Sequence, residues 1–197
     1  MSRLFKIGYG YDSHRFLNEE EKNLIHQQEQ VEVKTEFYSK DKKLIIGGVE
    51  LDEKYQKLYG PFKARSDGDV LYHAVVNALL SAIGDKDKRD IGKVFPNTDS
   101  KNSNRNSADF MQETAQMIKL SDYELLDLKL MVKGQPRVDW SKVEKNLLDF
   151  FSFQSIAPDI HVQATSGEEM DGAGNGLGVE VFVVALLQHK NLLLSGV

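Results

Sequence analysis

Three side chains in this sequence could hold a catalytic metal ion. Asp12 and His14 lie two residues apart in a segment that is expected to be extended, so both side chains point to the same side. A third ligand, His73, comes from an apolar segment farther along the chain. Asp, His and His leave one position open for water or substrate, as catalytic zinc requires. The alternative is that Asp12 caps a turn and His73 is a core histidine bonded to Asp69.

The apolar segment around His73 is predicted to be a buried helix with one polar stripe. Asp69, His73 and Asn77 recur every four residues, which places them on one helix face. A helix that is apolar around the rest of its circumference is buried, and its buried polar groups need partners. We expect Ser66 or Asp67 to cap this helix. Asp69, one turn before His73, is the expected hydrogen-bond partner of that histidine.

Other stretches could bind phosphates, although each also has an ordinary structural interpretation. Residues 164–169 combine two hydroxyls, turn amides and two glutamates after a predicted strand. Hydroxyls and amides can cradle phosphate oxygens while a carboxylate holds Mg²⁺; a simple turn is the alternative. The glycine-rich residues 172–178 lead into a strand, which excludes a dinucleotide fingerprint. Residues 90–99 could form a lid over a site or a solvated loop. Residues 133–137 could receive an anionic or planar ligand or form an ordinary turn.

The composition narrows the class of protein. A length of 197 residues with 41% hydrophobic residues predicts one soluble domain. The net charge of −5 argues against a nucleic-acid-binding protein. Because cysteine is absent, only histidines and carboxylates remain as strong metal ligands. The sequence has no apolar run long enough to span a membrane and starts directly with a strand pattern, so we expect a cytoplasmic protein.

The elements that must position these residues form a mixed α+β pattern. We predict strands over residues 4–10, 44–51, 125–133, 159–165 and 179–188, the second with a Gly-Gly bend. We predict helices over residues 67–83, 107–119 and 140–151. Asn106 or Ser107 is expected to cap the second helix. Residues 17–43 are polar and charged, and we interpret them as a surface insertion with a hairpin or a short helix, within a single domain over 1–197.

Five motifs resemble those of the 2-C-methyl-D-erythritol 2,4-cyclodiphosphate synthase family. In order they are GYDSH at 10–14, IIGGV at 45–49, SDGDVLYHA at 66–74, DIGKVFPNTD at 90–99, and an AL pair near the C-terminus. The resemblance covers nearly all of the chain except the insertion. It implies a mixed β-sheet with helices on one face, assembled as a homotrimer with the sheets around the threefold axis and active sites between subunits.

The resemblance also implies an intramolecular phosphorus–oxygen lyase reaction of the non-mevalonate isoprenoid route. The 2-phosphate of 4-diphosphocytidyl-2-C-methyl-D-erythritol 2-phosphate attacks the β-phosphorus of the diphosphate, which closes the cyclodiphosphate and releases CMP. The implied cofactors are Zn²⁺ and a second cation, Mg²⁺ or Mn²⁺. The implied partners are this nucleotide substrate, CMP and other copies of the chain, with no nucleic acid or membrane. A plastid is the alternative compartment if a transit peptide was removed.

Individual roles follow from the positions that match the family. The implied zinc ligands are Asp12, His14 and His73, and the implied ligand of the second cation is Glu168. Arg65 and Ser166 match catalytic positions beside the reacting phosphates. The cytosine-side turn, residues 133–139, is implied to come from the neighbouring subunit. The matching substrate-binding positions are Ser66, Asp90, Ile91, Gly92, Phe95, Pro96, Asn97, Thr98, Asp99, Lys133, Gly134, Gln135, Pro136, Arg137, Val138, Asp139, Thr165 and Gly167.

Several positions depart from the family pattern. Arg65 stands where most members have histidine, Ser166 replaces the usual threonine, and Asn77 and Asn97 replace aspartates. An active synthase is the leading hypothesis. The alternatives are a metal-binding trimer that has lost catalysis and serves as a binding partner, and a zinc hydrolase that activates water on a nucleotide diphosphate.

The central cavity that binds an isoprenoid diphosphate in many family members is altered here. Gly172 and Asn175 stand in place of its Phe and Arg, while Tyr9 and Phe182 replace its His and Glu. These substitutions predict that the chain does not bind such an effector there.

Overall fold

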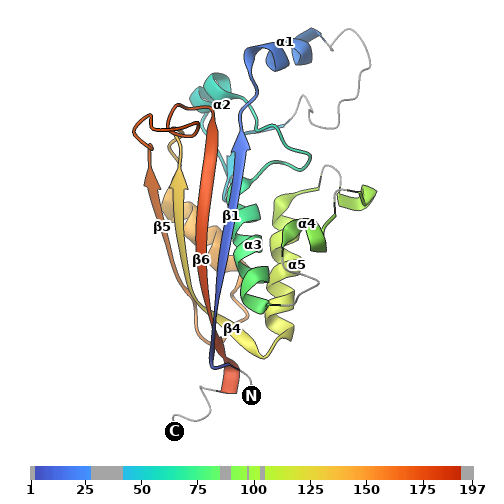
Figure 1. Ribbon diagram of the computed structural model, residues 1–197, viewed down its shortest axis with the longest axis vertical. Helices are drawn as coiled ribbons and strands as arrows, with labels where there is room; N and C mark the ends of the chain where they lie inside the picture. The colour runs from blue at the N-terminus through green and yellow to red at the C-terminus, as the bar shows by residue number, and fades with distance from the viewer. Residues whose placement is uncertain (1–2, 28–41, 85–89, 97, 103–104, 192–197) are drawn as a thin grey trace.

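The computed structural model describes residues 3–27, 42–84, 90–96, 98–102 and 105–191. These residues contain a four-stranded mixed sheet in the order β1-β6-β4-β5 (Figure 1). The strands are β1 (Phe5–Arg15), β4 (Tyr123–Lys133), β5 (Asp159–Thr165) and β6 (Gly178–His189). Strand β6 runs antiparallel to both of its neighbours, whereas β5 is parallel to β4 and is reached through helix α6 (Trp140–Phe150). A parallel pair requires such a crossover.

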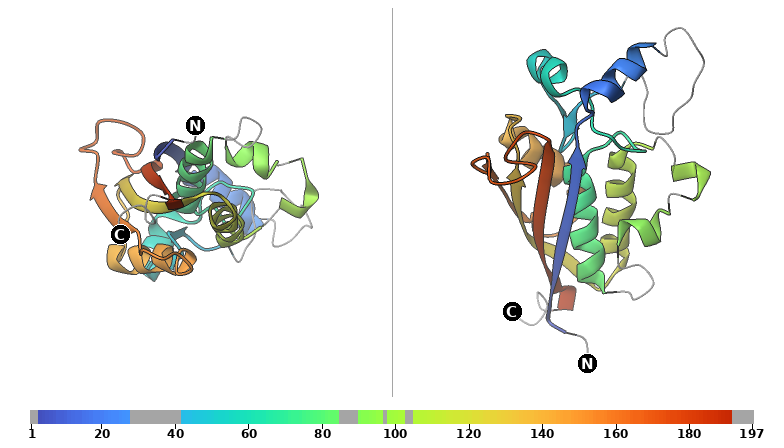
Figure 2. Two further views of the ribbon diagram at one scale, coloured as in Figure 1. Left: turned by 90° about the horizontal axis from the view of Figure 1, so that it is seen from below. Right: turned by 45° about the horizontal axis from the view of Figure 1, so that its top comes forward.

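Three helices, α3 (Val70–Ile83), α5 (Ser107–Leu120) and α6, pack against one face of the sheet (Figure 2). Side chains alternate along the strands: Val181 and Val183 of β6 are fully buried toward the helices, whereas Val184 is exposed. Helix α3 contacts β1 and β6 on one side and α5 on another. This position explains why α3 is apolar around most of its circumference. The predicted α+β class with a mixed sheet is confirmed.

Strand β1 and helix α3 touch backbone to backbone. A Cβ atom at Gly10 would lie 2.0 Å from the carbonyl oxygen of Ala74, and one at Gly8 would lie 1.9 Å from that of Ala78. Only glycine permits this approach. Because alternate residues of a strand share one face, Asp12 and His14 continue the row of Gly8 and Gly10 toward the start of α3.

The prediction of one strand with a Gly-Gly bend over residues 44–51 is wrong, because the chain reverses at the two glycines and forms a hairpin. Its strands are β2 (Ile45–Ile46) and β3 (Val49–Glu50), joined at Gly47 and Gly48. Both glycines have positive φ, 61° and 71°, as a two-residue hairpin turn requires. A two-residue Gly-Gly link between apolar residues is itself a hairpin signal.

Other boundaries also differ from the predictions. Strand β1 extends to Arg15, beyond the predicted end at Gly10. Helix α3 begins at Val70 and is capped by Asp69 rather than Ser66 or Asp67, whereas Asn106 caps α5 as predicted. Three elements were not predicted from the sequence: α2 (Glu53–Tyr59), α4 (Ile91–Val94) and the 3₁₀ turn η2 (Ser100–Asn102).

The predicted insertion begins with a short helix, α1 (Glu19–Gln27). Residues 28–41 of the insertion lie outside the described residues. Across the part of the chain that the structure describes, no helix combines the length and apolar character that a bilayer crossing needs.

Candidate active site

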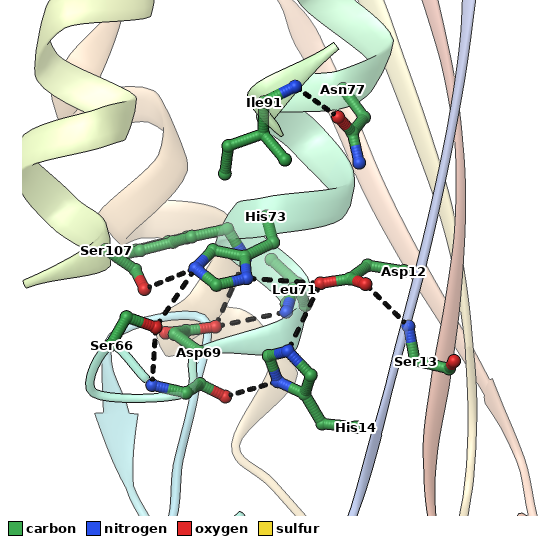
Figure 3. A network of polar contacts seen from close by, with 12 residues as sticks. Asp12, Ser13, His14, Ser66, Asp69, Leu71, His73, Asn77, Ile91 and Ser107 are labelled. Carbon is green, nitrogen blue, oxygen red and sulfur yellow. Dashed lines mark hydrogen bonds and ion pairs between the residues drawn. The ribbon is translucent and has the colours of Figure 1, made fainter. Parts of the chain in front are cut away.

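Asp12, His14 and His73 converge on one point at the start of α3 (Figure 3). Their ligand atoms all lie within 4.8 Å of one another, and they are the one such group among the described residues. Asp12 Oδ2 is 3.1 Å from His73 Nδ1 and 3.4 Å from His14 Nε2. Strand β1 supplies Asp12 and His14, and the first turn of α3 supplies His73. The predicted convergence of these three residues is therefore observed.

Both imidazole rings are held from the side away from Asp12. His14 Nδ1 lies 2.9 Å from the carbonyl oxygen of Gly68, and His73 Nε2 lies 2.9 Å from Ser107 Oγ. A carbonyl oxygen only accepts, so Nδ1 of His14 carries its hydrogen and Nε2 presents a lone pair. Burial lowers the pKa of His14, against the opposing charge of Asp12. The ring is therefore kept neutral, as a metal ligand must be.

The expectation that Asp69 is the partner of the His73 side chain is wrong. Asp69 Oδ1 accepts hydrogen bonds from the amides of Gly47, Leu71 and Tyr72 at 2.9, 3.1 and 3.1 Å. Its Oδ2 accepts from the amide of Gly48 at 2.7 Å. Asp69 thus caps α3 and ties the hairpin to it. Complete burial raises the pKa of this carboxyl to about 6, although the amide hydrogen bonds act in the opposite direction.

The donor set fits a divalent metal that binds nitrogen. Two imidazoles and one carboxylate, with an accessible cavity beside them, form the ligand set of catalytic zinc sites. The second nitrogen of each ring is already hydrogen-bonded, which is usual for metal-bound histidines. The rings of Phe62 and Phe110 lie 5.6 Å from His14 and 5.9 Å from His73, so apolar walls flank the site.

A cavity of roughly 310 Å³ opens beside the three ligands. Besides Asp12, His14 and His73, five residues that were predicted to belong to the site line it: Arg65, Ser66, Ile91, Gly92 and Phe95. It also contains residues that the sequence analysis missed: Lys63, Ala64, Asn102 and Phe110. No local pattern distinguishes these from ordinary surface and core residues. Their positions follow from how α5, η2 and the loop before α3 pack together.

The predicted lid over residues 90–99 contains the short helix α4, which is fixed at its start. Asn77 Oδ1 accepts from the amide of Ile91 at 2.9 Å, while its Nδ2 donates to the carbonyl oxygen of Tyr11 at 3.2 Å. An aspartate could not make the second bond, so the asparagine at this position has a structural reason. Asp90 caps α4 through the amide of Lys93.

The cavity is not lined by four other described residues that were predicted to bind substrate: Asp90, Pro96, Thr98 and Asp99. Hydrogen bonds that Lys101 donates lower the pKa of the half-buried Asp99. Asn97 lies outside the described residues.

The remaining predicted residues form a second cluster, at the turn 133–139 and the loop 165–171. Gly134 donates to the carbonyl oxygen of Thr165 at 3.0 Å. Gln135 Nε2 donates to the carbonyl oxygens of Ser166 and Gly174 at 3.1 and 2.7 Å. Ser166 Oγ donates to Glu168 Oε1 at 3.2 Å. The turn and the loop are thus tied into one unit.

This second cluster stands apart from the three ligands within one chain. The cavity is lined by none of the predicted residues in this cluster, which are Lys133, Gly134, Gln135, Pro136, Arg137, Val138, Asp139, Thr165, Ser166, Gly167 and Glu168. The ion pair of Lys133 with Asp171 raises the pKa of the lysine and lowers that of the aspartate. Asp139 caps α6 through the amide of Lys142. Both clusters nevertheless lie at the same end of the sheet, because Arg15 of β1 pairs with Gly178 of β6.

Comparison with known proteins agrees with the motifs. The profile of the YgbB family matches residues 5–188. This chain belongs to the YgbB family. A relative from Hydrogenobaculum sp. (strain Y04AAS1) is 31% identical over 188 residues, which cover 94% of this chain and 98% of the relative. It is named 2-C-methyl-D-erythritol 2,4-cyclodiphosphate synthase, so the resemblance to that family is confirmed.

Further relatives of this YgbB protein include a eukaryotic one. The Plasmodium falciparum (isolate 3D7) protein named 2-C-methyl-D-erythritol 2,4-cyclodiphosphate synthase, apicoplast, is 30% identical over 190 residues, which cover 94% of this chain and 73% of the relative.

Solved structures share the fold. One, described as an IspF (Plasmodium falciparum) CDP complex, superimposes with a TM-score of 0.65 at 23% identity over 97% of this chain and 100% of that chain. The bifunctional IspDF from Campylobacter jejuni superimposes with a TM-score of 0.68 at 22% identity over 94% of this chain and 42% of that chain.

Proposed function

We propose that this YgbB protein converts 4-diphosphocytidyl-2-C-methyl-D-erythritol 2-phosphate into 2-C-methyl-D-erythritol 2,4-cyclodiphosphate and CMP. The observation that carries the proposal is the convergence of Asp12, His14 and His73 beside a cavity that Arg65 and Ser66 line. Relatives that span nearly the whole chain carry the name of this synthase.

The proposed reaction needs no nucleophile from the protein. An oxygen of the 2-phosphate forms a bond to the β-phosphorus, and the bond from that phosphorus to the bridging oxygen breaks, so the bridging oxygen leaves with CMP. Attacking and leaving groups belong to one molecule. The protein must therefore fold the substrate and neutralise its charge, which are the main contributions to phosphoryl transfer. This is phosphorus–oxygen lyase chemistry.

The residues divide these tasks between them. Asp12, His14 and His73 would hold Zn²⁺, which supplies positive charge to a phosphoryl oxygen when bound. Arg65 adds a permanent charge in the same cavity, since arginine stays protonated at all relevant pH values. We propose that Glu168 holds the second cation, Mg²⁺ or Mn²⁺, because carboxylates bind these ions together with substrate phosphates.

We propose that the active site is completed between copies of the chain. The sheet face opposite the helices exposes apolar side chains: Ile7 and Tyr9 are 72% and 57% exposed, and Val184, the partner of Tyr9 in the β1–β6 register, is 46% exposed. A contiguous apolar face of this kind favours a protein partner. A homotrimer with its sheets around the threefold axis would cover it. The same assembly would bring the 133–139 turn of one copy toward the metal ligands of the next. We propose the cytoplasm as compartment, or a plastid if a transit peptide was removed.

The function can be tested by following products by mass spectrometry in ¹⁸O-labelled water, with Zn²⁺ and Mg²⁺ present. We expect CMP and cyclodiphosphate in equal amounts without ¹⁸O, because water takes no part in the ring closure. A linear product carrying ¹⁸O would instead show a zinc hydrolase. Tight substrate binding without CMP release would show a metal-binding trimer that has lost catalysis. Either result would refute the proposal.

A further inference from the structure

We propose that Ser107 and Asp67 set the tautomer of His73 and thereby present its Nδ1 to the metal. The inference deepens the proposed function, because it rests on the metal role of this histidine. Ser107 is the first residue of α5 and is fully buried. Its Oγ lies 2.9 Å from His73 Nε2 (Figure 3). Neither Ser107 nor Asp67 is among the residues that the family motifs assign to the site.

The direction of the hydrogen bonds follows from what each group can donate. Ser107 has a single hydroxyl hydrogen, and its Oγ is in short contact with Asp67 Oδ1. An ionised carboxylate only accepts, so the hydroxyl hydrogen points to Asp67. The serine oxygen can then only accept from His73. Nε2 of the ring must therefore carry the hydrogen, which leaves the lone pair on Nδ1.

Asp67 is itself fixed in this orientation. Its Oδ2 accepts from the backbone amide of Ser107 at 3.0 Å, and its Oδ1 is 3.3 Å from the amide of Asp69. The backbone of Asp67 donates to the carbonyl oxygen of Arg105 at 3.3 Å. The carboxylate therefore bridges the loop before α3 and the start of α5, and it cannot turn away from the serine without losing these bonds.

Two neighbours of the ring agree with this assignment. Ser66 Oγ lies 3.3 Å from the same Nε2, and although it accepts from the amide of Gly68 it keeps a second lone pair, with which it can accept the ring hydrogen more weakly. On the other side, His73 Nδ1 faces Asp12 Oδ2 at 3.1 Å. With the hydrogen on Nε2, this contact joins two acceptor atoms. Two acceptors at this separation are stabilised by a cation between them, which is the position proposed for the metal.

The test measures metal binding and the tautomer rather than turnover. In the zinc-loaded protein, ¹⁵N NMR of the histidine side chains should show His73 with a protonated Nε2 and a metal-bound Nδ1. Ser107→Ala removes the nearer acceptor and leaves only the longer contact to Ser66. Zinc affinity, measured by competition with a chromophoric chelator, should fall about 10–100-fold. Ser81→Ala is the matched control, since Ser81 lies on α3, the helix of His73, near its other end, and should leave zinc affinity unchanged.

Asp67→Asn is a sharper second variant because it keeps every side chain near its original size. If the asparagine oxygen accepts from the Ser107 amide, its NH₂ group donates to Ser107 Oγ. The hydroxyl hydrogen then turns to His73 and favours hydrogen on Nδ1, the atom that the metal needs. We expect at least a tenfold loss of zinc affinity with an unchanged circular dichroism spectrum.

Three results would overturn the inference: metal-bound Nε2 in the wild-type spectrum, zinc affinity within twofold of wild type in Ser107→Ala, or the same in Asp67→Asn. Failure of the synthase reaction is a separate result. A wild-type protein that binds zinc through Nδ1 but releases no CMP would refute the proposed function and leave this inference standing.

Discussion

Replacing Gly10 with alanine should dismantle the metal site without touching a ligand. The new Cβ would lie 2.0 Å from the carbonyl oxygen of Ala74 and 2.5 Å from the amide nitrogen of Ala78, whereas ordinary contacts begin at 3.4 Å. Both atoms belong to the backbone of α3, so no side chain can move aside. The strand and helix must separate by at least about 1 Å, since packed interiors have no slack to absorb the atom.

This separation acts directly on the ligands. Gly10 is two residues before Asp12 on β1, and Ala74 follows His73 on α3. The distance of 3.1 Å between Asp12 Oδ2 and His73 Nδ1 should open to roughly 4 Å. A zinc ion needs each ligand at about 2.0–2.2 Å, so we expect at least a tenfold loss of zinc affinity. Overpacking should also lower the free energy of unfolding by about 1–3 kcal/mol.

Chelator competition and urea unfolding would measure the two effects. Gly172→Ala is the matched control, because a Cβ at Gly172 meets no atom within 4 Å. It should change neither zinc affinity nor stability by more than about 1 kcal/mol. If Gly10→Ala bound zinc as tightly as wild type and unfolded at the same urea concentration, the argument from the close approach of β1 and α3 would be refuted.

Three other changes test separate parts of the site. His73→Ala should abolish zinc binding and CMP release, while its far-ultraviolet circular dichroism spectrum stays native. The control is His161→Ala at an exposed histidine, which should keep both activities. Full turnover in His73→Ala, with its zinc content checked, would contradict the metal assignment. Burial raises the pKa of Asp69 from 3.8 to about 6, so between these pH values the folded state binds a proton that the unfolded state has lost. The free energy of unfolding should therefore fall by about 3 kcal/mol as the pH rises from about 3.8 to about 6. Urea titrations at a series of pH values should show that the free energy of unfolding depends less on pH in Asp69→Asn than in the wild type. The same pH dependence in both proteins would refute this assignment. Gln135→Ala should loosen the turn from the loop and raise the KM for the nucleotide several-fold at unchanged zinc affinity; an unchanged KM would argue against that role.

The faces on which the candidate metal ligands lie could be predicted from local spacing, whereas the pairing of His73 with Asp12 and His14 followed from the resemblance to the family. The two-residue spacing of Asp12 and His14 fixes a common strand face, and the apolar surroundings of His73 fix its helix face. The partners of these ligands could not be predicted in the same way. Ser107 reaches His73 only because α5 packs beside α3, a contact that no spacing records.

Some misses had a usable signal. The Gly-Gly link at Gly47 and Gly48 indicates a hairpin, and the spacing of Gly8 and Gly10 within a strand indicates close approach by another backbone. Asp69 illustrates the opposite case. Three polar residues, Ser66, Asp67 and Asp69, could each cap α3, and the choice depends on the hairpin amides that Asp69 also binds.

Anomalous X-ray diffraction across the zinc absorption edge tests the central claim most directly. Crystals of the wild-type protein grown with Zn²⁺ should show one strong peak per chain at the start of α3. We expect distances of about 2.0–2.2 Å from that peak to Asp12 Oδ2, His14 Nε2 and His73 Nδ1. A peak bound by other residues, or no peak at these three side chains, would contradict it.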